Sequence, residues 1–362
     1  MRVALLAPVT WRTPPRAYGP WEQVVSLLAE GLVARGVQVT LFASLDSVTA
    51  ADLDGVCPRP FGEDATLDGR VWEALHIAHC FARSGDFDLV HNHLDWLPLA
   101  MSGFCQAPLL TTVHGFSSPR ILPAYQRSGS AFVSISDADR APGLSYIATV
   151  YHGIDLSQFP AGAAQFPAGA AQSPAGVAPS PAGAPPSPVG PGTGEELVAF
   201  GRIHADKGTA EAIEIARQVD RPLLICGPVH DEEYHATKVL PHVDGDRVRY
   251  LGNVGPADRA AILGGAAALL HPIGFDEPFG LSVVEAMACG TPVVAYRRGS
   301  MPEVVNEGET GFLAEDVDSA VIALSKALTL DRNHVRAVAR ARFSADRMVE
   351  DYVRVYQEVV GR

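Results

Sequence analysis

Short apolar segments rich in β-branched residues alternate with helical patterns along both halves of the chain, and this alternation constrains the fold more than any other feature. It is typical of parallel βαβ units, in which each helix crosses back over the sheet. We therefore predict an α/β protein with two doubly wound parallel sheets, whose ligands bind beyond the carboxyl ends of the strands. The expected strands are Val3–Ala7, Gln38–Phe42, Leu89–His91, Leu109–Val113, Ala131–Ile135, Ala148–Tyr151, Leu197–Phe200, Leu223–Cys226, Val248–Leu251, Ala268–His271 and Pro292–Ala295.

An uncharged repeat separates the two groups of strands. Proline recurs there every seven residues, and a glycine follows each proline two residues later. The repeat has no pair of apolar core positions for a coiled coil, and ordering it would cost backbone entropy that little side-chain burial offsets. We predict a disordered Pro/Ala/Gly linker. The expected organisation is an N-terminal Rossmann-like domain at 1–157, the linker at 158–194, a C-terminal Rossmann-like domain at 195–343, and a helix at 344–362 that packs back on the first domain.

The composition excludes several classes of protein. With 362 residues, 47% of them hydrophobic and 19% charged, the chain is long enough for two packed domains. A formal net charge of -13 makes nucleic acid and anionic lipid poor partners, so a phosphate site must depend on a local cluster of cations. The five cysteines form no C-x-x-C pair, which argues against a disulfide framework or a zinc ribbon.

The N-terminal apolar run, Val3–Ala7, is too short for the hydrophobic region of a signal peptide. No segment approaches the length of a membrane span. These features predict a cytoplasmic protein without a transmembrane segment. They leave the oligomeric state and peripheral membrane association open.

Two cations lie on the turn that follows the strand ending at Phe200. Arg202 and Lys207 are five residues apart, between Gly201 and Gly208, where a helix is expected to begin. Cations beside free backbone N–H groups suit a diphosphate, although a solvated turn with ordinary surface charges has the same spacing. The chain contains 25 arginines and only three lysines, so a lysine here suggests selection for a compact charge.

A second anion site is expected where the strand ending at His271 leads through a loop into a helix. That helix should begin near 279–282 and direct unpaired N–H donors beyond the sheet. Glu277 precedes it and Glu285 lies within it, so one carboxylate can meet a sugar and the other a ribose diol. Taken singly, they could equally be a helix-dipole complement and a surface glutamate.

Together these residues resemble the retaining glycosyltransferases of family 4, also called glycosyl transferases group 1. Glu277 and Glu285, followed by A-M-A-C-G-T-P-V-V-A, are similar to the E-x7-E motif of that family. The resemblance covers almost the whole chain except the proline repeat. Matching segments are A-Y-G-P-W-E at 17–22, T-V-H-G at Thr112–Gly115, Y-H-G-I-D at Tyr151–Asp155, G-R-x4-K-G at 201–208 and G-x-x-P-E-V-V at Gly299–Val305.

The resemblance implies the GT-B fold, in which an acceptor-binding domain and a nucleotide-sugar-binding domain face each other across a cleft. It implies transfer of a hexose, with retention, from a UDP- or GDP-linked sugar to a hydroxyl of a small molecule or glycan. Neither a metal nor another cofactor is expected. Such an enzyme would serve carbohydrate or glycoconjugate biosynthesis.

The resemblance also assigns roles in donor binding. Arg202 and Lys207 would hold the diphosphate and stabilise it as it leaves, while Glu277 contacts the donor sugar and Glu285 the ribose. Gly19 would let the backbone approach the pyrophosphate, and the turn at Asn253 would adjoin the base. The expected donor-binding residues are Gly19, Gly201, Asn253, Phe279, Gly280, Leu281, Ser282 and Glu285.

His114 matches the family's active-site histidine and is expected to hydrogen-bond the donor sugar near the reacting carbon. A front-face route would let the leaving phosphate take the acceptor proton, so His114 is not assigned as a general base. The expected catalytic residues are His114, Arg202, Lys207 and Glu277. The expected acceptor-binding residues are Trp11, His93, Asp95 and Trp96.

The sequence allows four other interpretations. His91, His93 and Asp95 could form a metal cluster, but their place at a strand end favours an acceptor pocket. A Rossmann oxidoreductase is disfavoured because no G-x-G-x-x-G follows the first strand. A non-catalytic nucleotide-sugar-binding protein and a GT-B nucleotide-sugar epimerase remain open.

Overall fold

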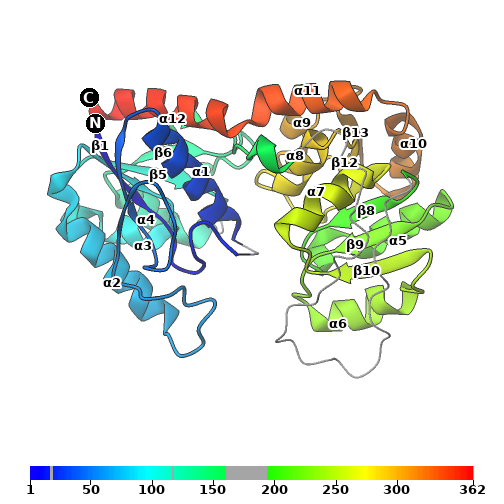
Figure 1. Cartoon of the computed structure of the whole chain (residues 1–362), viewed down its shortest axis with the longest axis horizontal. Coiled ribbons are helices and arrows are strands. Elements are labelled where there is room, and N and C mark those ends of the chain that lie inside the picture. Colours follow the sequence, from blue (N-terminus) through cyan, green and yellow to red (C-terminus); the bar gives the residue numbers. More distant parts are fainter. Residues whose placement is uncertain (17–18, 116–117, 160–193, 362) are drawn as a thin grey trace. The chain divides into compact units, whose positions relative to one another are not determined.

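The computed structural model describes residues 1–16, 19–115, 118–159 and 194–361. These residues form two compact units (Figure 1). Unit 1 comprises Met1–Asp155 and Arg342–Arg362, and unit 2 comprises Leu156–Ala341. Almost all of the segment predicted to be a disordered linker, residues 160–193, lies outside the described residues.

Unit 1 is built on a parallel sheet of seven strands in the order β3-β2-β1-β4-β5-β6-β7. The prediction of a doubly wound parallel sheet is confirmed, because the strand order reverses direction at β1. Buried apolar residues on both faces of the central strands account for their continuous apolar character. The strands are β1 (Arg2–Leu6), β2 (Gln38–Phe42), β3 (Asp52–Asp54), β4 (Leu89–Asn92), β5 (Leu109–Val113), β6 (Ala131–Ser134) and β7 (Ala148–Thr149).

The last helix of the chain belongs to unit 1. Ser344 caps it by accepting a hydrogen bond from the backbone N–H of Arg347, and its apolar face joins the core cluster that contains Leu28 and Leu32. Gly31 makes close packing there feasible, because a Cβ at this position would lie 2.5 Å from Val349 Cγ2. The helices of unit 1 are α1 (Pro20–Ala34), α2 (Gly69–Ala82), α3 (Trp96–Ala100), α4 (Leu122–Arg127) and α12 (Ala345–Val360).

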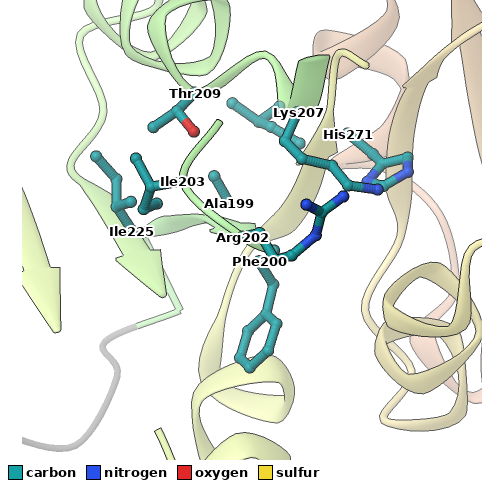
Figure 2. A pocket seen from close by; sticks show the side chains of 10 residues that line it. Ala199, Phe200, Arg202, Ile203, Lys207, Thr209, Ile225 and His271 are labelled. Carbon is teal, nitrogen blue, oxygen red and sulfur yellow. The ribbon is translucent and has the colours of Figure 1, made fainter. Parts of the chain in front are cut away.

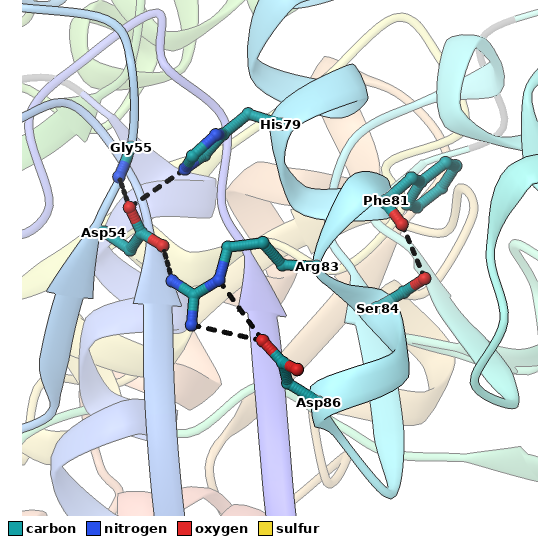
Figure 3. A network of polar contacts seen from close by, with 7 residues as sticks. All are labelled: Asp54, Gly55, His79, Phe81, Arg83, Ser84 and Asp86. Atoms are coloured by element: carbon teal, nitrogen blue, oxygen red, sulfur yellow. Dashed lines mark hydrogen bonds and ion pairs between the residues drawn. The ribbon is translucent and has the colours of Figure 1, made fainter.

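Edge strand β3 was not predicted, because its three residues, Asp-Leu-Asp, carry no apolar alternation. A polar network ties it to the end of α2 (Figure 3). Asp54 accepts hydrogen bonds from His79 at 2.9 Å and from the Gly55 N–H at 2.7 Å, and it pairs with Arg83. Polar side-chain contacts therefore add to the backbone pairing of β3 with β2 and to the packing of Leu53 against the core.

Unit 2 is built on a parallel sheet of six strands in the order β10-β9-β8-β11-β12-β13. It repeats the doubly wound topology, since the order reverses at β8. Strand β13 was not predicted from the sequence. The strands are β8 (Leu197–Phe200), β9 (Leu223–Cys226), β10 (Val248–Gly252), β11 (Ala268–His271), β12 (Val293–Tyr296) and β13 (Gly311–Ala314).

The helix that was expected to begin between Gly201 and Gly208 starts just after this segment, at Thr209. Residues Ala205–Lys207 form a 3-10 turn, and Gly208 follows in the left-handed region with φ 68°. A Cβ at Gly208 would lie 1.8 Å from the Pro272 carbonyl oxygen, so only glycine fits this close approach. The helices of unit 2 are α5 (Thr209–Gln218), α6 (Glu232–Tyr234), α7 (Pro256–Gly265), α8 (Leu281–Ala288), α9 (Met301–Val304), α10 (Val317–Ala327) and α11 (Arg332–Phe343), the last two residues of α11 belonging to unit 1. Within the described part of the chain, no helix has the length and apolarity that crossing a membrane requires.

Candidate active site

A pocket in unit 2 lies beyond the carboxyl ends of the neighbouring strands β8, β9 and β11 (Figure 2). Ala199, Ile225 and Leu270 contribute apolar walls. Its polar lining includes Arg202, Lys207 and His271, whose heads are drawn toward the same side of the pocket in Figure 2. The cationic turn predicted from the sequence thus lies at the ligand-binding edge of a doubly wound sheet.

Lys207 and Glu277 form a partly buried ion pair beside this pocket. Lys207 Nζ lies 2.7 Å from Glu277 Oε2 and 4.3 Å from the centroid of the Phe275 ring, and His271 Nε2 lies 3.7 Å from the same carboxylate oxygen. Burial alone would raise the pKa of Glu277, but the His271 imidazole and the Lys207 ammonium outweigh burial and lower it to about 2. The carboxylate is therefore ionised at every physiological pH.

The loop that carries Glu277 is held by the turn at Gly299 and Ser300. The Ser300 N–H donates a 2.8 Å hydrogen bond to the Glu277 carbonyl oxygen. Gly299 has φ 53°, and a Cβ there would lie 2.4 Å from both the nitrogen and the oxygen of the Glu277 backbone. The glycine of the G-x-x-P-E-V-V segment thus allows the backbone contact that positions Glu277.

Helix α8 begins immediately after this loop, as expected. Gly280 precedes it in the left-handed region, and Leu281 and Ser282 occupy its first turn. Among the described residues, no side chain caps its N-terminus. Phe279 is only 2% exposed, so any donor contact there would come from its backbone. Asn253 is exposed and follows β10, while Gly201 follows β8 and lines the pocket.

Glu285 of α8 is not a solitary surface carboxylate. Arg259 of α7 reaches it at 3.0 Å and also covers the ring of Phe200, with 5.0 Å between the guanidinium carbon and the ring centroid. Burial raises the pKa of Glu285, and the charge of Arg259 opposes that rise. Sequence reasoning missed Arg259 because it lies outside every recognised motif.

Arg202 has a second polar neighbour that the sequence did not reveal. Its Nη1 lies 3.3 Å from His230 Nδ1, and its Nη2 lies 4.0 Å from Asp206. Because the guanidinium can only donate, His230 Nδ1 accepts and its Nε2 carries the proton. The imidazole orients the guanidinium without neutralising its charge.

In unit 1, Gly19 precedes α1, and a Cβ there would lie 2.7 Å from Pro15 Cβ. Glu22, from the same motif, is buried and accepts a 3.1 Å hydrogen bond from the Trp11 N–H. Burial raises the pKa of Glu22 to about 7, although the backbone N–H groups of Glu22 itself and of Trp11 oppose this. The sequence assigned no role to this carboxyl group.

His114 follows β5 and is 7% exposed. Its Nε2 lies 2.9 Å from His93 Nδ1, its Nδ1 lies 3.3 Å from His152 Nε2, and Trp21 stacks on its ring with 5.2 Å between centroids. Burial, with the neighbouring imidazoles, lowers its pKa well below the usual value. His114 is therefore a neutral imidazole with both nitrogens engaged inside unit 1.

The residues predicted to bind the acceptor differ in their burial and surroundings. His93 is fully buried, with its nitrogens bound to His91 and His114, because it lies directly behind His114. Asp95 accepts a 2.5 Å hydrogen bond from Tyr125, and Trp96, at the start of α3, is 42% exposed. Trp11 is partly buried. In the described ranges, no group of three or more His, Cys, Asp or Glu side chains could hold a metal ion.

The geometry defines the class of the protein. Two Rossmann-like units, one of which bears a cationic turn and two carboxylates at its ligand-binding edge, constitute the GT-B fold, which glycosyltransferases of known structure share. The family model for glycosyl transferases group 1 matches residues 186–342, and the model for Glycosyltransferase Family 4 matches residues 21–158. The chain belongs to this glycosyltransferase family.

Known relatives agree along nearly the whole chain. Glycogen synthase from Mycobacterium tuberculosis is 25% identical over an alignment that covers 95% of this chain and 90% of that protein. Phosphatidyl-myo-inositol mannosyltransferase from Mycobacterium leprae is 26% identical, with 99% and 97% coverage. The structure of HepE from Anabaena in complex with UDP-glucose superposes with a TM-score of 0.68 at 17% identity, covering 99% of this chain and 100% of that chain. The protein is a glycosyltransferase.

Proposed function

We propose that this glycosyltransferase moves a hexose, with retention, from a UDP- or GDP-linked sugar to a hydroxyl acceptor. One relative is named as a mannosyltransferase, and HepE is in complex with UDP-glucose, which supports a hexose and a nucleoside diphosphate. Unit 2 binds the donor, and unit 1 contributes His114 and recognises the acceptor. The five cysteines are free thiols, which supports a cytoplasmic location that cell fractionation would test.

The observation that carries this proposal is the cluster of Arg202, Lys207 and His271 around one pocket at the sheet edge. The reaction breaks the bond between the anomeric carbon and the diphosphate oxygen, leaving negative charge on that oxygen. Arg202 and Lys207 stabilise this charge, and the acceptor hydroxyl passes its proton to the departing phosphate as it attacks from the same side.

Removing either cation should lower turnover. A charge-assisted hydrogen bond contributes roughly 1.5–3 kcal/mol, so Arg202→Ala and Lys207→Ala should each reduce kcat by about ten- to hundredfold. The measurement is hexose transfer, or hydrolysis of UDP-glucose and GDP-mannose, by the purified variants. Arg217→Ala removes an exposed cation of α5 from the same unit and should leave turnover unchanged. If all three variants turn over at the rate of the wild-type protein, Arg202 and Lys207 do not stabilise the departing phosphate.

We propose further that no metal takes part, because the two cations and the start of α8 supply the positive potential that a divalent ion would otherwise provide. Turnover in excess EDTA should stay within about twofold of the untreated rate, a change below ~0.5 kcal/mol in the barrier. Loss of activity in EDTA, with recovery on adding Mg²⁺ or Mn²⁺, would contradict this proposal.

A further inference from the structure

Unit 1 contains a hydrogen-bonded chain of four buried imidazoles, which we call the imidazole chain: His91, His93, His114 and His152. Nitrogen to nitrogen distances along it are 3.2 Å from His91 to His93, 2.9 Å from His93 to His114 and 3.3 Å from His114 to His152. None of the four side chains is more than 7% exposed. They come from β4, from the end of β5 and from the segment after β7, so the fold brings them together.

The chain ends on hydroxyl groups of the C-terminal helix. His91 Nδ1 lies 2.7 Å from the Tyr356 hydroxyl, and His91 Nε2 lies 2.8 Å from Thr112 Oγ1. Thr112 Oγ1 in turn lies 2.8 Å from the hydroxyl of Tyr352. Both tyrosines are fully buried on α12.

The Tyr356 hydroxyl determines where the proton of His91 resides. Among the described residues, His91 is its sole hydrogen-bond partner. Tyr356 must therefore donate to His91 Nδ1, or else leave a buried hydroxyl proton unsatisfied, which is costly. Nδ1 of His91 then carries no proton, and its Nε2–H donates to Thr112.

The remaining protons follow from one imidazole to the next, because each neutral ring has one donor nitrogen and one acceptor nitrogen. His93 faces the bare Nδ1 of His91, so it carries its proton on Nε2 and accepts through Nδ1. His114 must then donate from Nε2 to His93, which leaves its Nδ1 as the acceptor for His152. Every member of the chain has the Nε2–H form.

We propose that Tyr356, acting through His91 and His93, fixes His114 as the Nε2–H tautomer and holds its ring in place. The three are positioning residues for His114. The consequence for transfer rests on the proposed function of His114, whereas the tautomer itself depends only on unit 1. A substrate hydroxyl can donate to His114 Nδ1 only by displacing His152, so the longer of its two ring contacts, at 3.3 Å, is the one that exchanges with substrate.

The wild-type tautomers test the proposal first. Two-bond ¹⁵N–¹H correlation spectra of protein labelled with ¹⁵N-histidine separate Nδ1–H from Nε2–H rings, and His114→Gln identifies the His114 signal. We expect His114, His91 and His93 all as Nε2–H between pH 6.5 and 8. A His114 ring protonated on Nδ1, or a cationic ring, would overturn the proposal without any activity measurement.

Two tyrosine variants form a matched pair. Tyr356→Phe removes the hydroxyl on His91 Nδ1, whereas Tyr352→Phe removes a buried hydroxyl from the same helix but leaves Thr112 to accept from His91. In Tyr356→Phe the ratio of the two His114 tautomers should shift roughly two- to tenfold toward Nδ1–H, since about one hydrogen bond no longer biases it. In Tyr352→Phe the ratio should not move. An unchanged ratio in both variants, or an equal shift in both, would refute the positioning of His114 by Tyr356.

Kinetic measurements then separate the positioning of His114 from its proposed function. Tyr356→Phe should lower kcat about two- to tenfold with little change in donor KM, and Tyr352→Phe should leave both unchanged. A tautomer shift without any loss of kcat would show that Tyr356 positions His114 but that His114 does not serve transfer. That result would contradict only the proposed role of His114 in the reaction.

Discussion

At pH 5, unit 1 is expected to be close to unfolding, although it is stable at pH 7. The four members of the imidazole chain and His76 of α2 are all buried. Burial, the largest cause in each case, lowers the pKa of His76 to about 4 and that of His152 to about 3, and it holds the pKa values of His91, His93 and His114 well below the usual value. In the unfolded chain these rings would have a pKa near ~6.5 and would charge freely.

The sign of the effect follows from proton binding. Because the unfolded state binds more protons than the folded state below pH ~6.5, stability falls as the pH drops through that value. Each imidazole that stays neutral in the fold costs roughly 2 kcal/mol between pH 7 and pH 5. The five together cost on the order of 8 kcal/mol if the imidazole chain as a whole takes up one proton in the folded state. Glu22, whose pKa burial raises to about 7, gains a proton in the folded state over the same range, which offsets roughly 2 kcal/mol and leaves a net cost on the order of 6 kcal/mol. That is comparable with the whole stability of a domain, ~5–15 kcal/mol.

Tryptophan fluorescence can follow unit 1 alone, because all four tryptophans, Trp11, Trp21, Trp72 and Trp96, lie in it. Urea denaturation from pH 5 to pH 8 should show the fluorescence midpoint falling steeply below pH 6.5. His152→Asn should reduce the number of protons taken up on unfolding by about one, whereas His334→Gln, at an exposed position of unit 2, should not change it. A midpoint independent of pH would refute the neutral chain.

The central strands were predicted from the sequence because their burial leaves a signature. Both faces of a central parallel strand are covered, so segments such as Leu109–Val113 and Leu223–Cys226 appear as continuous apolar runs and were predicted with the observed bounds. Edge strands β3 and β13 lack that signature. Contacts of Asp54 with His79 and Arg83 help to hold β3, and only the tertiary structure brings these residues together.

The site divides in the same way. Arg202, Lys207, Glu277 and Glu285 lie at motif positions, and the sequence named them from spacing and family resemblance. It could not show that Lys207 pairs with Glu277, seventy residues away, or that Arg259 pairs with Glu285. Lys207 and Glu277 belong to separate motifs whose contact no spacing reveals, and Arg259, a single arginine on a helix, carries no periodic signal.

The imidazole chain was partly visible in the sequence, since His91 and His93 were singled out as candidates for an acceptor pocket. They are buried beside His114 because they lie in β4 and just after its end, and because α12 packs there. Tyr356 of α12, which contacts His91, lies 265 residues further along the chain. Sequence patterns encode which residues are apolar, but not which buried polar groups satisfy one another.

Replacing Glu277 with Gln should move stability and donor binding in opposite directions. Lys207 and Glu277 are 16% and 13% exposed, so removing the carboxylate leaves a largely buried ammonium without its counter-charge, at a cost of roughly 3 kcal/mol in the free energy of unfolding. The same substitution removes the negative charge that repels a phosphate. UDP and GDP should therefore bind on the order of tenfold more tightly, ~1.4 kcal/mol, and give larger thermal shifts.

Turnover in Glu277→Gln should nevertheless fall about ten- to hundredfold, since tighter binding of the free diphosphate does not replace a carboxylate that orients Lys207 and, in the proposed reaction, contacts the sugar. Thermal unfolding with and without UDP or GDP, together with transfer rates, measures both effects. Glu307→Gln breaks an exposed ion pair with Arg297 in the same unit and should change neither by a measurable amount. The double variant Lys207→Met with Glu277→Gln should be more stable than Glu277→Gln alone, because it buries no unpaired charge. If diphosphate binding weakens in Glu277→Gln, the carboxylate does not compete with the phosphate for Lys207, and the assignment of Lys207 to the leaving group is wrong.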